Sequence, residues 1–123
     1  MSTRIVREYH FEAAHFLPRV VPGHKCARMH GHSYRVTITI EGEVHPELGW
    51  VMDFGDLDAH VLPLIDGLDH RVLNEQPGLE NPTSELLAAW LWQRIEPNVP
   101  ALTELEVSET PSSRCVYRGP RRG

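Results

Sequence analysis

A chain of 123 residues, of which 41% are hydrophobic, can bury one modest core, so we expect a single domain spanning residues 1–123. Its net charge of −5 argues against nucleic acid as the main partner, because binding to phosphates requires a basic face. It has no apolar run of the roughly 20 residues that span a membrane, and Met1–Glu12 lacks the apolar core of a secretion signal, so we expect a cytoplasmic protein without a membrane partner. There Cys26 and Cys115 are expected to be free thiols, although the sequence leaves a bridge between them open.

The first two predicted strands show the period of two that is typical of half-buried β-strands. In the first, over residues 9–15, the inward row consists of Tyr9, Phe11, Ala13 and His15. In the second, over residues 34–41, the inward row consists of Tyr34, Val36, Ile38 and Ile40. If the second strand extends back toward its start, His30 and His32 lie on the same face as its apolar residues.

Three histidines are therefore predicted on inward strand faces, namely His15, His30 and His32. Three imidazoles without a fourth protein ligand are typical of a catalytic zinc site, whose open position takes water or substrate. Cys26 places a thiol just before His30 and is a candidate nucleophile or base. The alternative is a chance His-X-His pair on an exposed strand, because the chain has eight histidines. The spacing alone leaves both interpretations open.

The segment after the second strand is predicted to hold a loop, a short strand and a helix. Residues 42–49 are typical of a loop, and the short apolar run of residues 50–54 predicts a strand or a strand end. Asp53 is expected to cap a helix over residues 56–66, where apolar residues recur at helical spacing. Pro63 falls inside this helix and predicts a kink or an early end.

Asp69 and His70 follow the first helix and are a candidate acid/base pair. A carboxylate that reaches an imidazole fixes its tautomer, which a general acid or base requires. Adjacent residues are poorly placed for a direct side-chain hydrogen bond, however. The alternative is a pair of polar residues at a helix end.

The pair Asn81-Pro82 predicts the start of a second helix, because Asn is a strong N-cap and Pro suits the first helical position. The helix is expected to reach Glu96, just before Pro97. Its apolar stripe consists of Leu86, Leu87, Trp90, Leu91 and Ile95.

Two strands are predicted at the end of the chain, over residues 103–109 and around residues 116–117. In the first of them, Glu109 continues the apolar row of Leu105 and Val107. A buried acid needs a partner, whereas a glutamate at a strand end lies in water, and the pattern leaves both arrangements open.

The order of these elements favours an α+β fold, with a four-stranded antiparallel sheet and two helices on one face in the order ββααββ. Such a small sheet has exposed edges that invite pairing with another chain. We therefore expect the sheets of several copies to join into a larger closed sheet on oligomerisation.

Six short motifs are distributed along almost the whole chain. They are Phe11-Glu12-Ala13-Ala14-His15, Cys26-X3-His30-Gly31-His32, Trp50-Val51-Met52-Asp53-Phe54, Leu68-Asp69-His70, Asn81-Pro82-Thr83-Ser84-Glu85 and Glu109-Thr110. Together they resemble the 6-pyruvoyl-tetrahydropterin synthase superfamily, and most closely its bacterial 6-carboxytetrahydropterin synthases of the queuosine pathway. The biopterin enzymes resemble Cys-X5-His-Gly-His instead, and folate-pathway relatives place a glutamate where Cys26 stands.

This resemblance implies the tunnelling fold and a zinc cofactor. The site residues that it implies are the metal ligands His15, His30 and His32, the catalytic residues Cys26, Asp69 and His70, and the substrate contacts Glu109, Thr83 and Ser84. Cys26 would be the general base, and the Asp-His pair would reach the site from a neighbouring subunit. Glu109 would anchor the pterin.

The implied reaction converts 7,8-dihydroneopterin triphosphate into 6-carboxy-5,6,7,8-tetrahydropterin, acetaldehyde and triphosphate, in a trimer or hexamer. One alternative is a 6-pyruvoyl-tetrahydropterin synthase. A non-catalytic zinc- or pterin-binding module would not need the thiol or the Asp-His pair, and a His-rich hydrolase or oxygenase would not explain Glu109. The candidates for triphosphate contacts are Lys25, Arg28, Arg114, Arg118, Arg121 and Arg122, of which the C-terminal four also fit a solvated tail.

Overall fold

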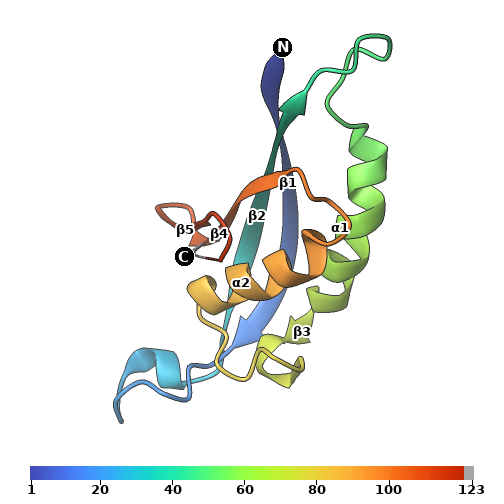
Figure 1. The fold of residues 1–123 in the computed structure, drawn as a ribbon. Helices are drawn as coiled ribbons and strands as arrows, with labels where there is room; N and C mark the ends of the chain where they lie inside the picture. The colour runs from blue at the N-terminus through green and yellow to red at the C-terminus, as the bar shows by residue number, and fades with distance from the viewer. Residues whose placement is uncertain (121–123) are drawn as a thin grey trace.

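The computed structural model describes residues 1–120, and Figure 1 shows a twisted sheet with two helices packed against it. The strands are β1 (Ser2–His15), β2 (His30–Glu43), β3 (Arg71–Val72), β4 (Leu102–Thr110) and β5 (Ser113–Tyr117). The helices are α1 (Phe54–Leu68) and α2 (Ser84–Ile95), with short 3-10 helices at Lys25–Ala27 and Leu73–Glu75. None of the helices in this part of the chain is long and apolar enough to cross a bilayer.

The sheet has five strands in the order β3-β1-β2-β4-β5, so the predicted count of four was one too low. The four predicted strands pair antiparallel, as expected, whereas β3 pairs parallel to β1. Two residues are too few to show an alternating pattern, so β3 leaves no signal in the sequence. Within residues 1–120 the sheet stays open, with β3 and β5 as its edges.

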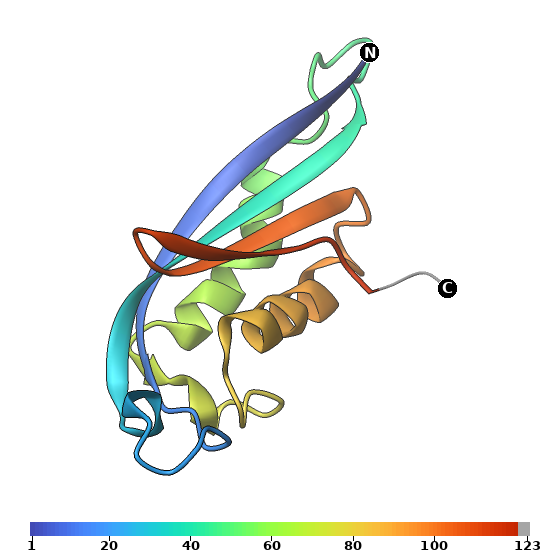
Figure 2. The same ribbon diagram turned by 90° about the vertical axis from the view of Figure 1, so that its left-hand side faces the viewer.

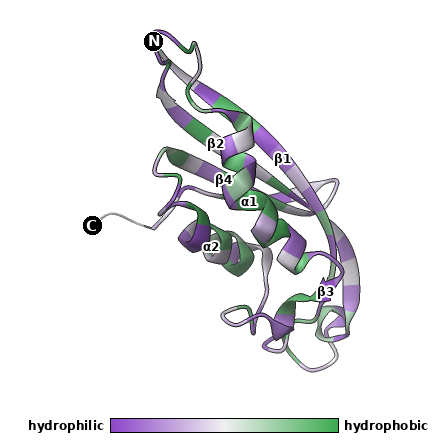
Figure 3. Cartoon of the chain, turned by 90° about the vertical axis from the view of Figure 1, so that its right-hand side faces the viewer, coloured by the Kyte–Doolittle hydropathy of each residue, from purple (hydrophilic) through white to green (hydrophobic). Residues whose placement is uncertain are grey.

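Both helices cover the same face of the sheet, as Figure 2 shows from the side. Figure 3 shows hydrophobic and hydrophilic residues alternating along β1 and β2. Successive side chains of a strand point to opposite faces, so every second residue of these strands faces the helices. The inward residues of the helices are Leu57, Val61, Ile65, Leu68, Leu87, Ala88, Leu91 and Ile95, all buried. The α+β architecture with two helices on one face is therefore confirmed.

Helix α1 begins after Asp53, whose carboxylate accepts from the Gly55 N–H at 3.2 Å, as predicted. The predicted early end at Pro63 was wrong, because the helix continues to Leu68. Pro63 removes the hydrogen bond to the carbonyl of Ala59, and both residues lie on the exposed side of the helix. Water can therefore take the free carbonyl, and the helix persists.

Residues 50–52 form bends and not the predicted strand or strand end. The chain turns back on itself here, since Gly49 has a positive φ of 77° and the His45 N–H donates to the Trp50 carbonyl at 2.8 Å. Val51 and Met52 still pack against the core. Their apolar character therefore reflects packing at the sheet end and not pairing within the sheet.

Helix α2 starts at Ser84, two residues later than the start predicted at Pro82, and its N-cap is Thr83. The Thr83 hydroxyl oxygen accepts from the Leu86 N–H at 3.1 Å. The Pro82 carbonyl lies 2.9 Å from the His15 ring on β1, so it does not take part in the helix. The helix ends at Ile95, one residue before the predicted Glu96.

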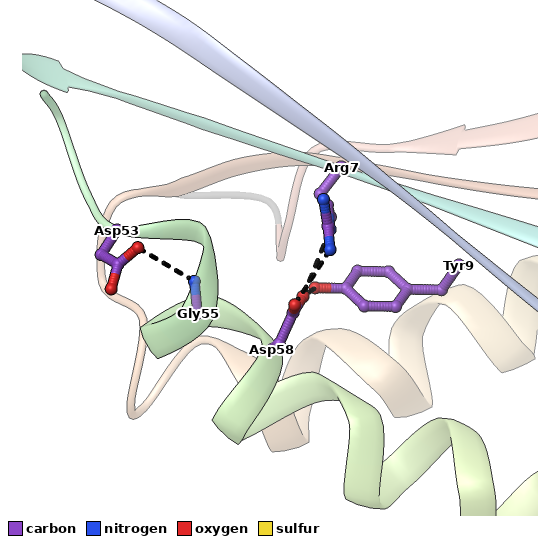
Figure 4. A network of polar contacts seen from close by, with 5 residues as sticks. All are labelled: Arg7, Tyr9, Asp53, Gly55 and Asp58. Carbon is purple, nitrogen blue, oxygen red and sulfur yellow. Dashed lines mark hydrogen bonds and ion pairs between the residues drawn. The ribbon is translucent and has the colours of Figure 1, made fainter.

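A polar network joins β1 to α1 (Figure 4). The Tyr9 hydroxyl donates to Asp58 Oδ1 at 2.6 Å, and the Arg7 guanidinium donates to both carboxylate oxygens at 3.0 and 3.3 Å. These bonds hold the pKa of Asp58 below its ordinary value of 3.8, and the bond from the Tyr9 hydroxyl has the largest effect. The network thus links β1 to α1 at the edge of the core, on the face of the sheet that the helices cover.

The Asp58→Ala variant should lower the free energy of unfolding by about 1–3 kcal/mol at pH 7, because the part-buried Tyr9 hydroxyl loses its acceptor. The pKa of Asp58 is lower in the folded chain than its ordinary value of 3.8, so this stabilisation is fully present above pH 3.8. It disappears as the pH falls through the pKa of Asp58 in the folded chain. Urea unfolding of both proteins at pH 7 and in acid measures the difference. Equal stability at pH 7 would contradict the role assigned to the network.

Candidate functional site

Three histidines meet where the ladder between β1 and β2 ends. His15 lies directly opposite His30 in the antiparallel register, and His32 lies opposite Ala13 on the same face. The ring centroids are 4.6 Å apart for His15 and His30, 5.1 Å for His15 and His32, and 4.9 Å for His30 and His32. One nitrogen from each ring lies within 4.8 Å of the others. The structure therefore brings together the three histidines that strand parity predicted.

Hydrogen bonds to backbone carbonyls orient two of the rings. His15 Nδ1 lies 2.9 Å from the Pro82 carbonyl, and His30 Nδ1 lies 2.6 Å from the Arg28 carbonyl. A carbonyl oxygen only accepts, so each Nδ1 carries the hydrogen. In the neutral rings, Nε2 is then left with a free lone pair, which is the form that binds metals.

The buried nitrogens of this cluster fit a metal ion. Nε2 of His15 and Nε2 of His32 are both buried and have no hydrogen-bond partner within residues 1–120. An unpartnered buried polar atom is costly, and a cation that accepts the lone pairs would remove that cost. The cluster in the described part of the chain consists of three imidazoles, which leaves a position open for water or substrate.

Burial holds the pKa of His15 below 6.5, and the hydrogen bond to the Pro82 carbonyl only partly opposes this effect. Folded His15 therefore stays neutral to a lower pH than in the unfolded chain, where it takes up a proton as the pH falls through 6.5.

The metal-free protein should consequently lose stability as the pH falls below 6.5, and His15 should add a slope of at most about 1.4 kcal/mol per pH unit. Chemical denaturation between pH 8 and pH 5 measures this slope in the wild type and in His15→Gln. The variant should show a shallower dependence. Identical slopes would show that His15 does not contribute.

Cys26 lies in the 3-10 helix Lys25–Ala27, in the loop that joins β1 to β2 at the histidine end of the ladder (Figure 2). Its thiol is partly exposed and free, and Cys115 is free as well, as expected. The Cys26 N–H donates to His24 Nδ1 at 3.0 Å, and its carbonyl accepts from the Leu17 N–H at 2.8 Å. The thiol is not a member of the histidine cluster.

Asp69 and His70 form a direct contact, with His70 Nδ1 3.0 Å from Asp69 Oδ2, so the expectation of poor placement was wrong. His70 has a φ of 57°, in the left-handed region, which allows its ring to turn back toward the preceding carboxylate. Glu12 on β1 holds this conformation, because its N–H donates to Asp69 Oδ1 at 2.9 Å and its carbonyl accepts from the His70 N–H at 2.6 Å. Hydrogen bonds to the Asp69 carboxylate lower its pKa, and the bond from the Glu12 N–H has a larger effect than the bond from His70.

The His70 ring projects outward, with its side chain 77% exposed. It lines an open cavity of about 450 Å³ that His32 also borders. An exposed imidazole backed by a carboxylate is suited to proton exchange with a group outside its own chain.

Glu109 lies near the cluster and not in open water, since its side chain is 25% exposed and its Oε2 is 3.7 Å from His32 Nε2. It borders a cavity of about 410 Å³ between the start of α2 and strands β4 and β5. The residues lining that cavity are Ser84, Glu85, Val107, Glu109, Ser113, Arg114 and Cys115. Ser84 therefore borders the same cavity as Glu109, whereas the Thr83 oxygen is used as the helix cap.

Comparison with similar proteins agrees with this fold. Residues 4–120 match the family described as 6-pyruvoyl tetrahydropterin synthase. The chain belongs to this family.

Two curated relatives are named 6-carboxy-5,6,7,8-tetrahydropterin synthase. The protein from Synechocystis sp. is 45% identical, over 95% of this chain and 94% of its own length. The one from Bacillus subtilis is 33% identical, over 99% of this chain and 88% of its own length. The solved structure of Caenorhabditis elegans 6-pyruvoyl tetrahydropterin synthase superposes with a TM-score of 0.90 at 26% identity, covering 98% of this chain and 97% of that one.

In this 6-pyruvoyl tetrahydropterin synthase family member, the cavity beside Glu109 is lined by two further residues that were not predicted to belong to the site. Glu85 adds a second carboxylate from the first turn of α2, next to Ser84. Cys115 on β5 pairs with Val107 on β4, and burial, followed by the nearby Glu85, raises its pKa. Glu85 could have been found from its position at a predicted helix start, whereas Cys115 depends on the register between two strands.

The candidates for triphosphate contacts separate into two groups. Lys25 and Arg28 are exposed in the loop that carries Cys26. Arg114 pairs with Glu106 at 3.4 Å and Arg118 with Glu104 at 3.2 Å. Arg114 borders the cavity beside Glu109. Arg121 and Arg122 lie outside the described residues.

Proposed function

We propose that this chain is a zinc-dependent 6-carboxy-5,6,7,8-tetrahydropterin synthase of queuosine biosynthesis. It would convert 7,8-dihydroneopterin triphosphate, with uptake of one water, into the carboxypterin, acetaldehyde and triphosphate. The observation that carries the proposal is the cluster of three histidines, with two unpartnered buried nitrogens, beside a cavity that contains Glu109. The names of the relatives at 45% and 33% identity support the choice of product.

His15, His30 and His32 would hold the zinc through ring nitrogens that lie within 4.8 Å of one another. Zinc bound to neutral imidazoles supplies a Lewis acid that polarises the oxygens of a substrate side chain. The carbonyls of Pro82 and Arg28 keep the rings of His15 and His30 in the tautomer that such a site needs.

Glu109 would select the pterin. The pterin edge presents a ring N–H and an amino group side by side, and one carboxylate can accept from both in parallel. Ser84 borders the same cavity and would add a polar contact to the ring, as would the hydroxyl hydrogen of Thr83 at the helix start. The partly buried position of Glu109 strengthens such bonds, because the local dielectric is lower than in water.

Cys26 and His70 would move the protons. Cys26 would take a proton from the substrate side chain, and triphosphate would leave by elimination. His70 would then give or accept a proton as the carbon–carbon bond breaks. Asp69 accepts from His70 Nδ1, so Nε2 would be the nitrogen that exchanges the proton.

Assembly with further copies of the chain would complete this site. His70 is largely exposed, and β3 and β5 leave the sheet open at both edges within residues 1–120. A neighbouring subunit could therefore supply Asp69 and His70 to the cavity of the next, in a trimer or hexamer whose sheets join into a barrel.

Incubation of the purified zinc-loaded protein with 7,8-dihydroneopterin triphosphate tests the proposal, with products followed by chromatography and mass spectrometry. We expect carboxytetrahydropterin and acetaldehyde in equal amounts. A pyruvoyl product would instead identify a 6-pyruvoyl-tetrahydropterin synthase. Absence of turnover in a protein that binds both zinc and a pterin would indicate a binding module and contradict the proposal.

A further inference from the structure

We infer that His24 is a positioning residue that holds Cys26 in place through the Nδ1 atom of its ring. This inference rests on the proposed role of Cys26 in proton transfer. His24 lies outside the histidine cluster and borders neither of the cavities described above. Its role would be to act on the backbone that carries the thiol.

Both backbone polar groups of Cys26 are hydrogen-bonded, although the residue lies in a surface loop. The N–H donates to His24 Nδ1 at 3.0 Å, and the carbonyl accepts from the Leu17 N–H at 2.8 Å. Leu17 is two residues beyond His15, so the second bond links the thiol segment to the end of β1. The first bond depends on a single side chain, and a substitution can therefore remove it.

His24 is the N-cap of the 3-10 helix Lys25–Ala27, with φ −65° and ψ 136°. Its carbonyl accepts from the Ala27 N–H at 3.0 Å, while its ring takes the Cys26 N–H. Just beyond this turn, the Arg28 carbonyl accepts from His30 Nδ1 at 2.6 Å. Hydrogen bonds thus connect the segment around this turn to Leu17, two residues beyond His15, and to the ring of His30.

This chain of bonds sets where the thiol can lie relative to the proposed metal ligands. A catalytic base has to stay within hydrogen-bond reach of the proton that it removes. A displacement of about 1 Å at a distance from the chemistry can cost on the order of 100-fold in rate. Loss of the cap would release one of the two bonds that hold Cys26, so its effect should fall on turnover more than on substrate binding.

Two substitutions that introduce a side-chain amide distinguish the roles of the two ring nitrogens of His24. In His24→Asn the side-chain oxygen lies the same number of bonds from Cα as Nδ1, so it can accept the Cys26 N–H. In His24→Gln the oxygen takes the place of Nε2 and overshoots that N–H. The two variants have the same chemistry, so their comparison remains informative even if His24→Ala fails to fold.

The first readout is the rate at which iodoacetamide modifies Cys26, measured by peptide mass spectrometry in the zinc-loaded protein. Cys115, in the cavity between α2 and β5, is the internal reference. We expect His24→Ala and His24→Gln to raise the rate at Cys26 relative to Cys115 several-fold, because the loop opens more often. His24→Asn should behave like the wild type.

The second readout is turnover of 7,8-dihydroneopterin triphosphate. We expect kcat to fall on the order of 10-fold in His24→Ala and His24→Gln, with KM and zinc content within about twofold of the wild type. His24→Asn should restore kcat. A wild type that is inactive would contradict the proposed function, whereas the modification rates would still decide whether His24 holds Cys26.

His45 provides a matched control. Its Nδ1 also caps a turn, accepting from the Glu47 and Leu48 N–H groups at 3.2 and 3.1 Å, in the loop between β2 and α1. His45→Ala should leave the Cys26 modification rate and kcat unchanged.

Three results would overturn the inference. One is a His24→Ala protein with wild-type modification rate and kcat. Another is rescue by Gln and not by Asn, which would assign the role to Nε2. The third is loss of zinc together with kcat, which would place the effect on the metal cluster.

Discussion

The His30→Ala variant should bind zinc at least about 100-fold more weakly than the wild type and lose turnover with it. Replacing a group that only supports a metal ligand costs about 10- to 100-fold in affinity, and loss of a ligand should cost more. With His30 removed, only His15 and His32 remain of the described cluster. His30 is the more informative choice than the fully buried His15, because it is only partly buried and its removal should disturb the core less.

Metal content after dialysis against a weak chelator, together with competition against a zinc indicator, measures this effect. His60→Ala is the control, because His60 is exposed on α1 and lies outside the cluster. Stripping zinc from the wild type should abolish turnover, and adding zinc back should restore it. A His30→Ala protein that retains equimolar zinc and full turnover would exclude the histidine cluster as the metal site.

The Glu109→Gln variant should lower kcat/KM by on the order of 10²- to 10⁴-fold. A carboxylate accepts two hydrogen bonds from the pterin edge, each worth about 1.5–3 kcal/mol when one partner is charged. The glutamine amide keeps one oxygen acceptor, but its NH₂ group would face an N–H donor of the pterin. One hydrogen bond is therefore lost, and the other is weakened because the acceptor is no longer charged. Zinc binding should be preserved, because the histidine nitrogens cluster without Glu109.

Steady-state kinetics with 7,8-dihydroneopterin triphosphate, and titration with the product pterin, measure this loss. Glu104→Gln is the matched control, because Glu104 is on the same strand, its side chain is also 25% exposed, and neither it nor its partner Arg118 borders the cavity beside Glu109. That variant should stay within about twofold of the wild type, as surface substitutions usually have small effects. Equal losses in both variants would show that Glu109 has no specific role in binding the pterin.

Local patterns predicted much of the site correctly. The period of two along β1 and β2 placed His15, His30 and His32 on one face, and the structure brings their rings within about 5 Å. Strand parity is a property of consecutive residues, so it needs no knowledge of the rest of the chain. The cap at Asp53 was predictable for the same reason, because its carboxylate binds an N–H two residues away.

The errors have a common cause in contacts between residues far apart in sequence. The start of α2 was misplaced because the Pro82 carbonyl binds His15, 67 residues away. The Asp69-His70 contact was predicted to be unfavourable, but it forms because His70 adopts a left-handed conformation. Hydrogen bonds with Glu12, which is 57 residues from Asp69, hold that conformation, and the local sequence does not reveal them. The two-residue strand β3 exists only because β1 lies next to it.

The sequence by itself determined which side chains share a strand face, which family the motifs resemble and which residues could bind a metal. Each of these depends on residue type and short spacing. Only the tertiary structure decided the tautomers of His15 and His30, the partly buried setting of Glu109, and the presence of Glu85 and Cys115 beside it. These features arise where separate elements pack together, and packing is set by the whole fold and not by neighbours in the chain.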